Sequence, residues 1–100
     1  MRALFSPLAS QDLEEIGDYI AQDNPNRALT FIQELREQCK KICNVPLGYR
    51  ARPELGDGIR SCLFSNYVIL YRPEESDVLI IRVLLHGAMD LLQHMTKIDT

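Results

Sequence analysis

The stretch of sequence that decides the fold runs from Gly58 to Gly87 and reads GIRSCLFSNYVILYRPEESDVLIIRVLLHG. It holds three runs rich in aliphatic, β-branched and aromatic residues, at 59–64, 67–72 and 78–85, and two short polar connections separate these runs. Runs of this composition joined by short polar connections are typical of β-hairpins. The stretch therefore predicts an antiparallel meander of three strands.

The run at 78–85 is expected to be a central strand of this sheet. Both of its alternating sets of side chains are apolar except at Arg82, so both of its faces should be largely covered by other parts of the protein. The run at 67–72 is β-branched and aromatic, and the polar ends of its two tyrosines need water or a partner. We expect this run to lie beside the run at 78–85.

The sequence before this stretch predicts one strand and two helices. Arg2–Phe5 is short and mostly apolar, and the Ser6-Pro7 pair that follows is able to cap and start a helix. Apolar residues recur at spacings of three and four in 7–22 and again in 26–43, which predicts two amphipathic helices. Because the break around Asn24-Pro25 is short, the two helices should form an antiparallel hairpin.

These elements together predict an α+β fold with the order β-α-α-β-β-β. The helical hairpin should pack on one face of a small, mainly antiparallel sheet. Segment 44–58 is rich in proline and glycine, which favours an irregular crossover. Met89–Lys97 contains enough apolar residues for a short closing helix. One hundred residues suffice for a single domain spanning 1–100 and are too few for two.

Charge and hydropathy narrow the classes of function. The formal net charge is -3 at pH 7 and the isoelectric point is about 5.3, whereas proteins that depend on phosphate contacts usually carry a basic face. We therefore expect no sequence-specific binding of nucleic acid. No segment approaches the roughly 20 apolar residues of a membrane span, and residues 1–7 lack the pattern of a signal peptide. A cytoplasmic protein that does not bind membranes is expected.

The chain has three cysteines, Cys39, Cys43 and Cys62, without the dense spacing of a disulfide framework. Cys39 and Cys43 are one helical turn apart, which is a possible spacing for a pair of metal ligands. Both also fall on the apolar stripe of the second predicted helix, where thiols act as small hydrophobic groups. We expect buried, reduced thiols, with no metal and no cofactor.

Polar residues in and before the sheet are the candidates for a functional site. Arg50 and Arg52 lie on the crossover and are either solvated charges or contacts for an anionic target. A phosphoryl-transfer site built from Arg60, Tyr71, Arg82 and His86 is an alternative, with His86 as base and the arginines as charge stabilisers. Whether these side chains share a face depends on strand register. The other interpretation is that they serve the fold or contact a partner.

Several segments resemble the ParE and RelE superfamily of small bacterial toxins. The stretch FSPLASQDLEEIGDYI at 5–20 is similar to the first helix of that family, and NPNRA at 24–28 is similar to its inter-helix turn. GIRS at 58–61, NYVILYR at 66–72 and VLLHGAMD at 83–90 are similar to ParE segments in the same order. The resemblance covers nearly the whole chain and implies the same fold.

RelE-type members of the superfamily cleave messenger RNA in the ribosome without metal. They use basic side chains and often a tyrosine near the carboxyl terminus. This sequence has Val68 where many of them place an arginine, and Ala88, Met89 and Asp90 follow His86-Gly87 without an arginine or tyrosine. The resemblance therefore implies that the nuclease residues are absent and that the protein is not an enzyme.

ParE-type members act by binding DNA gyrase, which blocks replication and lets cleaved DNA accumulate, and they serve in plasmid stabilisation. The resemblance of this chain to ParE-type members implies a ParD-like antitoxin that forms a hetero-oligomer with the toxin. The alternatives are an RNA-cleaving RelE-like protein and a non-toxic family member that only binds a partner. Leu8, Tyr19 and Phe31 are either core residues or exposed contacts for the antitoxin. The candidate residues for binding a partner or target are Arg50, Arg52, Arg60, Tyr71, Arg72, Arg82, His86, Met89 and Asp90.

Overall fold

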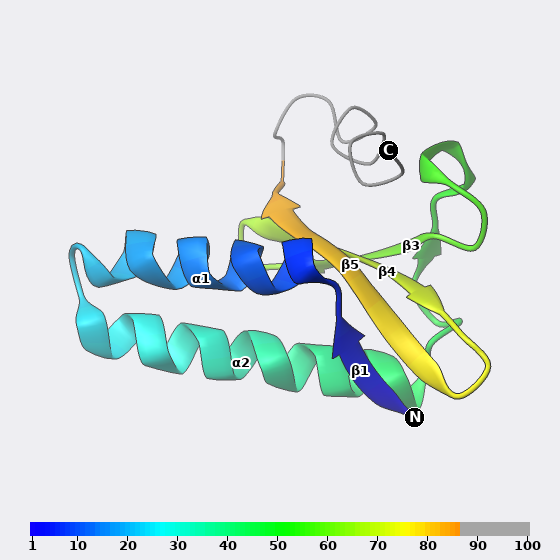
Figure 1. Cartoon of the computed structure of the whole chain (residues 1–100), viewed down its shortest axis with the longest axis horizontal. Helices are drawn as coiled ribbons and strands as arrows, with labels where there is room; N and C mark the ends of the chain where they lie inside the picture. The colour runs from blue at the N-terminus through cyan, green and yellow to red at the C-terminus, as the bar shows by residue number, and fades with distance from the viewer. Residues whose placement is uncertain (87–100) are drawn as a thin grey trace.

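The computed structural model describes residues 1–86, and it consists of a helical hairpin packed against a five-stranded sheet (Figure 1). The order of the strands in the sheet is β1-β5-β4-β3-β2. β1 runs parallel to β5, and the other neighbours are antiparallel. The elements are β1 (Arg2–Phe5), α1 (Pro7–Ala21), α2 (Pro25–Asn44), β2 (Arg50–Ala51), the 3-10 helix η1 (Pro53–Leu55), β3 (Arg60–Phe64), β4 (Tyr67–Pro73) and β5 (Asp77–Leu85).

The predicted α+β fold and its element order are confirmed. β5 is an interior strand and lies beside β4, as expected, while β4 occupies the middle of the sheet. The crossover is more regular than predicted, because it contains β2 and η1. The predicted helix at Met89–Lys97 lies outside the described residues. No helix within residues 1–86 is long and apolar enough to cross a membrane.

Both helices begin with a side-chain cap, of which the cap at Ser6 was predicted. The side chain of Ser6 accepts a hydrogen bond from the backbone N–H of Ala9 at 3.0 Å. The side chain of Asn24 accepts one from the backbone N–H of Arg27 at 3.0 Å. In each helix the next residue is a proline in the first turn, where its missing N–H costs nothing. These caps fix where the hairpin starts and turns.

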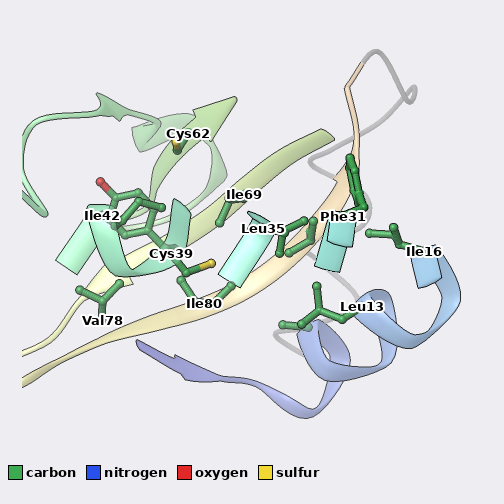
Figure 2. Packing of buried hydrophobic residues seen from close by; sticks show 13 residues of the cluster. Leu13, Ile16, Phe31, Leu35, Cys39, Ile42, Cys62, Ile69, Val78 and Ile80 are labelled. Atoms are coloured by element: carbon green, nitrogen blue, oxygen red, sulfur yellow. The ribbon is translucent and has the colours of Figure 1, made fainter. Parts of the chain in front are cut away.

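The main core lies between the helices and the sheet (Figure 2). Phe31, which the sequence left open between core and surface, belongs to this core and is 6% exposed. Leu8 and Tyr19 are instead exposed. The buried members of the main core are Ala9, Leu13, Ile16, Phe31, Leu35, Cys39, Ile42, Cys62, Ile69, Tyr71, Val78, Ile80 and Val83.

A second, smaller apolar cluster occupies the face of the sheet opposite the helices, called here the outer sheet face. Leu55 of η1 and Ile59 join four sheet residues there. The crossover thus contributes apolar side chains to a second core, a role that its proline and glycine content did not predict. The sheet residues of this cluster are Val68, Leu70, Ile81 and Leu84.

A β-bulge interrupts the pairing of β4 with β5. Leu70 pairs with Arg82 while the next residue, Tyr71, pairs with Ile80, so Ile81 is the extra residue. A bulge bends its strand and changes the direction of the side chains next to it. Here the bulge comes directly before Arg82 and thereby affects one of the predicted site residues.

Candidate functional site

Arg60 and Tyr71, two of the predicted site residues, fasten the loop that follows α2. They are cross-strand neighbours in β3 and β4. A guanidinium nitrogen of Arg60 donates to the carbonyl oxygens of Tyr49 at 2.7 Å and Leu47 at 3.3 Å. The Oη of Tyr71 donates to the carbonyl oxygen of Pro46 at 2.7 Å. Both side chains therefore hold backbone carbonyl groups of the loop through hydrogen bonds.

Tyr71 is the largest of the fully buried side chains in the described part of the chain. Burial raises the pKa of its phenol from 10.0 to about 12. Such a phenol stays protonated at neutral pH and is directed at a carbonyl oxygen of the protein itself. Tyr71 is therefore a structural residue, and it is not placed to transfer a proton to a substrate.

Arg82 is held by a carboxylate on α1. Its Nε and Nη2 donate to the two carboxylate oxygens of Asp12 at 2.8 and 2.9 Å. The side chains of Arg82 and Asp12 are only 13% and 8% exposed. The hydrogen bond to Asp12 raises the pKa of the Arg82 guanidinium. This two-point contact satisfies the guanidinium of Arg82, the one basic residue of β5.

Residues at the start of α1 also bond to the edge of β5 beyond the point where β1 ends. β1 pairs with β5 only as far as Ile80, and beyond it the Oγ of Ser6 donates to the carbonyl oxygen of Ile81 at 2.7 Å. Asp12 then accepts the backbone N–H of Val83 at 2.9 Å. The start of α1 thus forms hydrogen bonds both to the backbone edge of β5 and to the Arg82 guanidinium. The second contact is possible because the bulge turns the Arg82 side chain toward α1.

The sequence analysis did not identify Asp12, although this residue accepts the hydrogen bonds of Arg82 and of the Val83 N–H. It lies among Gln11, Glu14 and Glu15 on an amphipathic helix, where the sequence does not distinguish one acidic residue from its polar neighbours. The available signal was Arg82 itself, since a lone charge in an apolar strand needs a buried partner of opposite sign.

Arg50, Arg52 and Arg72 lie together on the outer sheet face. Arg50 pairs with Ser61 in the ladder between β2 and β3, and Arg52 donates to the Oγ of Ser61 at 3.4 Å. Ser61 is opposite Leu70, and Arg72 is opposite Leu79. Since Leu70 belongs to the cluster on the outer sheet face and Leu79 packs against that cluster, the three arginines lie on that face as well.

These three arginines remain open to solvent to different degrees. Arg52 donates to Glu54 at 2.7 Å, a hydrogen bond that lowers the pKa of the Glu54 carboxyl. Arg72 is 43% exposed at its side chain and contacts Glu74 at 3.2 Å. Arg50 is exposed. Leu63, opposite Val68 on the same face, is 63% exposed. The outer sheet face thus combines basic groups with an uncovered aliphatic side chain.

His86 lies just beyond the end of β5 and is exposed. Its backbone N–H donates to the carbonyl oxygen of Asn66. Met89 and Asp90 lie outside the described residues. Arg60, Tyr71 and Arg82 therefore make internal contacts, whereas His86 lies at the surface.

The thiols follow the expectation in two of three cases. Cys39 and Cys62 are buried and Cys43 is half-buried. Burial raises the pKa of all three, that of Cys39 to about 12. Within residues 1–86 no three His, Cys, Asp or Glu side chains are grouped so that they could hold a metal ion.

Comparison with known proteins gives the family. Residues 3–91 match the family described as the ParE toxin of the type II toxin–antitoxin system parDE. The fold is similar to a solved structure of the chromosomal ParDE toxin–antitoxin system from P. aeruginosa, with a TM-score of 0.72 and 25% identity over 85% of this chain and 95% of that one.

It is also similar to the toxin–antitoxin complex RelBE2 from Mycobacterium tuberculosis, with a TM-score of 0.56 and 25% identity over 84% of this chain and 95% of that one. A comparison with curated proteins found no match. Because the family match spans most of the chain and agrees with the fold, the protein belongs to the ParE toxin family of type II toxin–antitoxin systems.

Proposed function

We propose that this protein is a toxin that binds DNA gyrase in the cytoplasm, stops supercoiling and causes cleaved DNA to accumulate. A ParD-like antitoxin binds it in a hetero-oligomer and neutralises it. Membership of the ParE toxin family supports both parts of the proposal. The similar solved structures, a ParDE system and a toxin–antitoxin complex, support the antitoxin as partner.

The observation that supports a binding mechanism is that the basic and phenolic side chains already form hydrogen bonds to other groups of the protein. Arg60 and Tyr71 are bound to loop carbonyls, and Arg82 is bound to Asp12. General acid–base catalysis and charge stabilisation need groups directed at the reacting atoms. The three candidate groups are directed at the protein's own backbone and carboxylate, so they favour a toxin that acts without a reaction of its own.

The outer sheet face is the surface proposed to contact the target. Arginine is enriched in protein interfaces and among the residues that contribute most of the binding energy, and an exposed apolar side chain is stabilised when a partner covers it. Arg50, Arg72 and the exposed Leu63 supply such a combination. Arg52 supports the arrangement through Ser61 and Glu54.

A DNA supercoiling assay with purified gyrase and toxin free of antitoxin tests the proposal. We expect loss of supercoiling, linear DNA after protein digestion, and reversal by the cognate antitoxin. Arg50→Glu should need several-fold more protein for the same effect, because it reverses a charge on the contact surface. Lys41→Glu is the matched control, since Lys41 is exposed on α2 and the charge change is the same. Unchanged supercoiling with folded wild-type protein would contradict the proposal.

A further inference from the structure

A pocket lies between α1 and the carboxyl end of β5 and is called here the α1–β5 pocket. Figure 1 shows the end of β5 beside α1. The pocket has a volume of about 480 Å³ and is lined by Asp12, Glu15, Tyr19, Tyr67, Arg82 and Leu85, among others. A volume of this size is typical of ligand sites in proteins. The buried pair of Asp12 and Arg82 forms part of the wall, whereas Glu15, Tyr19 and Leu85 are exposed.

The pocket carries a net negative charge. Asp12 and Arg82 neutralise each other through their two hydrogen bonds, which leaves the carboxylate of Glu15. The amide of Gln11 donates to this carboxylate at 3.1 Å, and within residues 1–86 no lysine or arginine forms an ion pair with it. The hydrogen bond to Asp12 raises the pKa of the Arg82 guanidinium, and the charge of Glu15 adds to this rise. The pocket therefore favours a cation over an anion.

Two phenol rings form the aromatic part of the pocket. The Tyr67 ring is held by Phe31, with the two ring centres 5.8 Å apart. Burial raises the pKa of the Tyr67 phenol, and the neighbouring phenol of Tyr19 raises it further. Tyr19 is 69% exposed and Leu85 is 55% exposed, so both offer apolar surface to another molecule. Aromatic faces attract cations, and the rings therefore select the same charge as Glu15.

An arginine side chain matches all of these features. Its guanidinium is planar, stacks on aromatic rings and forms two parallel hydrogen bonds with one carboxylate. Its methylene groups lie on apolar surface while the charged end keeps its polar contacts. The ammonium of a lysine or a polyamine is a compact point charge without a planar face. The combination of ring, carboxylate and leucine therefore favours arginine over other cations.

We propose that the α1–β5 pocket binds an arginine side chain of DNA gyrase, whose guanidinium contacts Tyr19 and Glu15 and whose methylene groups cover Leu85. The surface around the pocket has the matching charge, because residues 3–26 include five acidic side chains and no basic one. An enzyme that binds DNA needs basic side chains for the phosphates, so this acidic surface complements the proposed target. The proposal rests on the proposed function for the source of the arginine.

The pocket is tested first with designed peptides and the full chain. The probe is the acetylated, amidated peptide Ala-Leu-Arg-Leu-Ala, and its control has citrulline, the uncharged isostere, in place of arginine. We expect the arginine peptide to shift the backbone amide resonances of Glu15, Tyr19, Tyr67 and Leu85, and the citrulline peptide to shift them much less at the same concentration. Equal shifts with both peptides, shifts confined to other surfaces, or equally strong binding of spermidine in the pocket would overturn the proposal.

Variants then test the charge and the ring separately. Glu15→Lys should weaken binding of the arginine peptide about tenfold, since it replaces an attractive charge by a repulsive one. Its matched control is Glu14→Lys, which makes the same change at an exposed position of α1 outside the pocket lining and should leave the affinity nearly unchanged at physiological salt. Tyr19→Ala removes an exposed ring, so the affinity should fall about fivefold at an unchanged melting temperature. Equal effects of Glu15→Lys and Glu14→Lys, or unaltered affinity in Tyr19→Ala, would contradict the proposal.

The supercoiling assay separates this proposal from the proposed function. Glu15→Lys and Tyr19→Ala should each need several-fold more protein than wild type to stop supercoiling, while Glu14→Lys should match wild type. Full inhibition by both pocket variants would overturn the pocket assignment and leave the proposed function standing. A wild-type protein that does not affect gyrase but binds the arginine peptide in the pocket would overturn the proposed function and gyrase as the source of the arginine.

Two other occupants of the pocket are distinguished by binding measurements. Self-association of the wild-type protein that is lost in Glu15→Lys would assign the pocket to an arginine of a second copy. Loss of antitoxin binding in Tyr19→Ala, with unchanged inhibition of gyrase, would assign it to the antitoxin. We expect neither result, and either one would overturn the proposal.

Discussion

Arginines at the junctions between elements and arginines on the outer sheet face of this protein are used in opposite ways. At the α1–β5 junction, Arg82 is 13% exposed and makes two hydrogen bonds to one carboxylate. On the outer sheet face, Arg72 is 43% exposed and, within residues 1–86, its guanidinium donates only to the half-exposed Glu74. The comparison indicates that burial and the number of internal acceptors decide whether an arginine serves the fold or remains available to a partner.

The largest effect is expected from breaking the buried pair. Asp12→Ala leaves Arg82 buried without a counter-charge and the N–H of Val83 without an acceptor. It should lower the free energy of unfolding by about 3 to 5 kcal/mol, measured by urea denaturation. The matched control is Glu34→Ala, which removes the exposed contact to Arg27 at 2.7 Å and should leave the urea midpoint nearly unchanged. Similar losses of stability in both variants would contradict the claim that the buried pair contributes more to stability than an exposed pair.

A smaller loss is expected from Tyr71→Phe. The change removes one buried hydrogen bond, to the carbonyl oxygen of Pro46, and should cost about 1 to 2 kcal/mol. Because that bond fastens the loop after α2, amide hydrogen exchange should rise in 45–49 more than in β5. Uniform acceleration across the protein would show that the phenol does not hold this loop in particular.

The pH dependence of stability tests the contribution of the Tyr71 phenol separately. Burial raises the pKa of Tyr71 from 10.0 to about 12, so the unfolded chain releases this proton at lower pH than the folded protein. The stability that depends on the protonated phenol is complete below about pH 10 and is lost as the pH rises toward 12. Urea denaturation from pH 8 to 11 should show a steeper loss in wild type than in Tyr71→Phe. Parallel curves would contradict this assignment.

The smallest effect on stability is expected on the outer sheet face. Arg72→Glu reverses a half-exposed charge with one solvent-exposed contact, and it should change the free energy of unfolding by about 0.5 kcal/mol or less. The same variant should inhibit gyrase less than wild type in the supercoiling assay. A loss of stability as large as that of Asp12→Ala would place Arg72 with the structural arginines.

The sequence predicted the fold well because local patterns determine most of it. Helical spacing, the cap at Ser6, the break at Asn24-Pro25 and the three apolar runs of the meander are all local, and each element appears where it was expected. β2 was missed because a two-residue strand carries no periodic signal. The bulge at Ile81 was missed because simple alternation along an apolar run contains no sign of an extra residue.

The candidate site was predictable only in its residue types. Arg60, Tyr71 and Arg82 do carry specific contacts, but their partners are far away in sequence: Tyr71 bonds to a residue 25 positions before it, and Arg82 to one 70 positions before it. Strand register and the path of the crossover fix these pairs, and neither is visible in the sequence.

The most direct test of the central claim, that these side chains serve the fold and not a reaction, is primer extension on messenger RNA from translating ribosomes. The wild-type protein should produce no new 5′ ends at concentrations that stop gyrase. His86→Ala is the informative control, because His86 is exposed outside the internal network and its replacement should leave the fold intact. New ends that appear with the wild-type protein and disappear with folded His86→Ala would contradict the account.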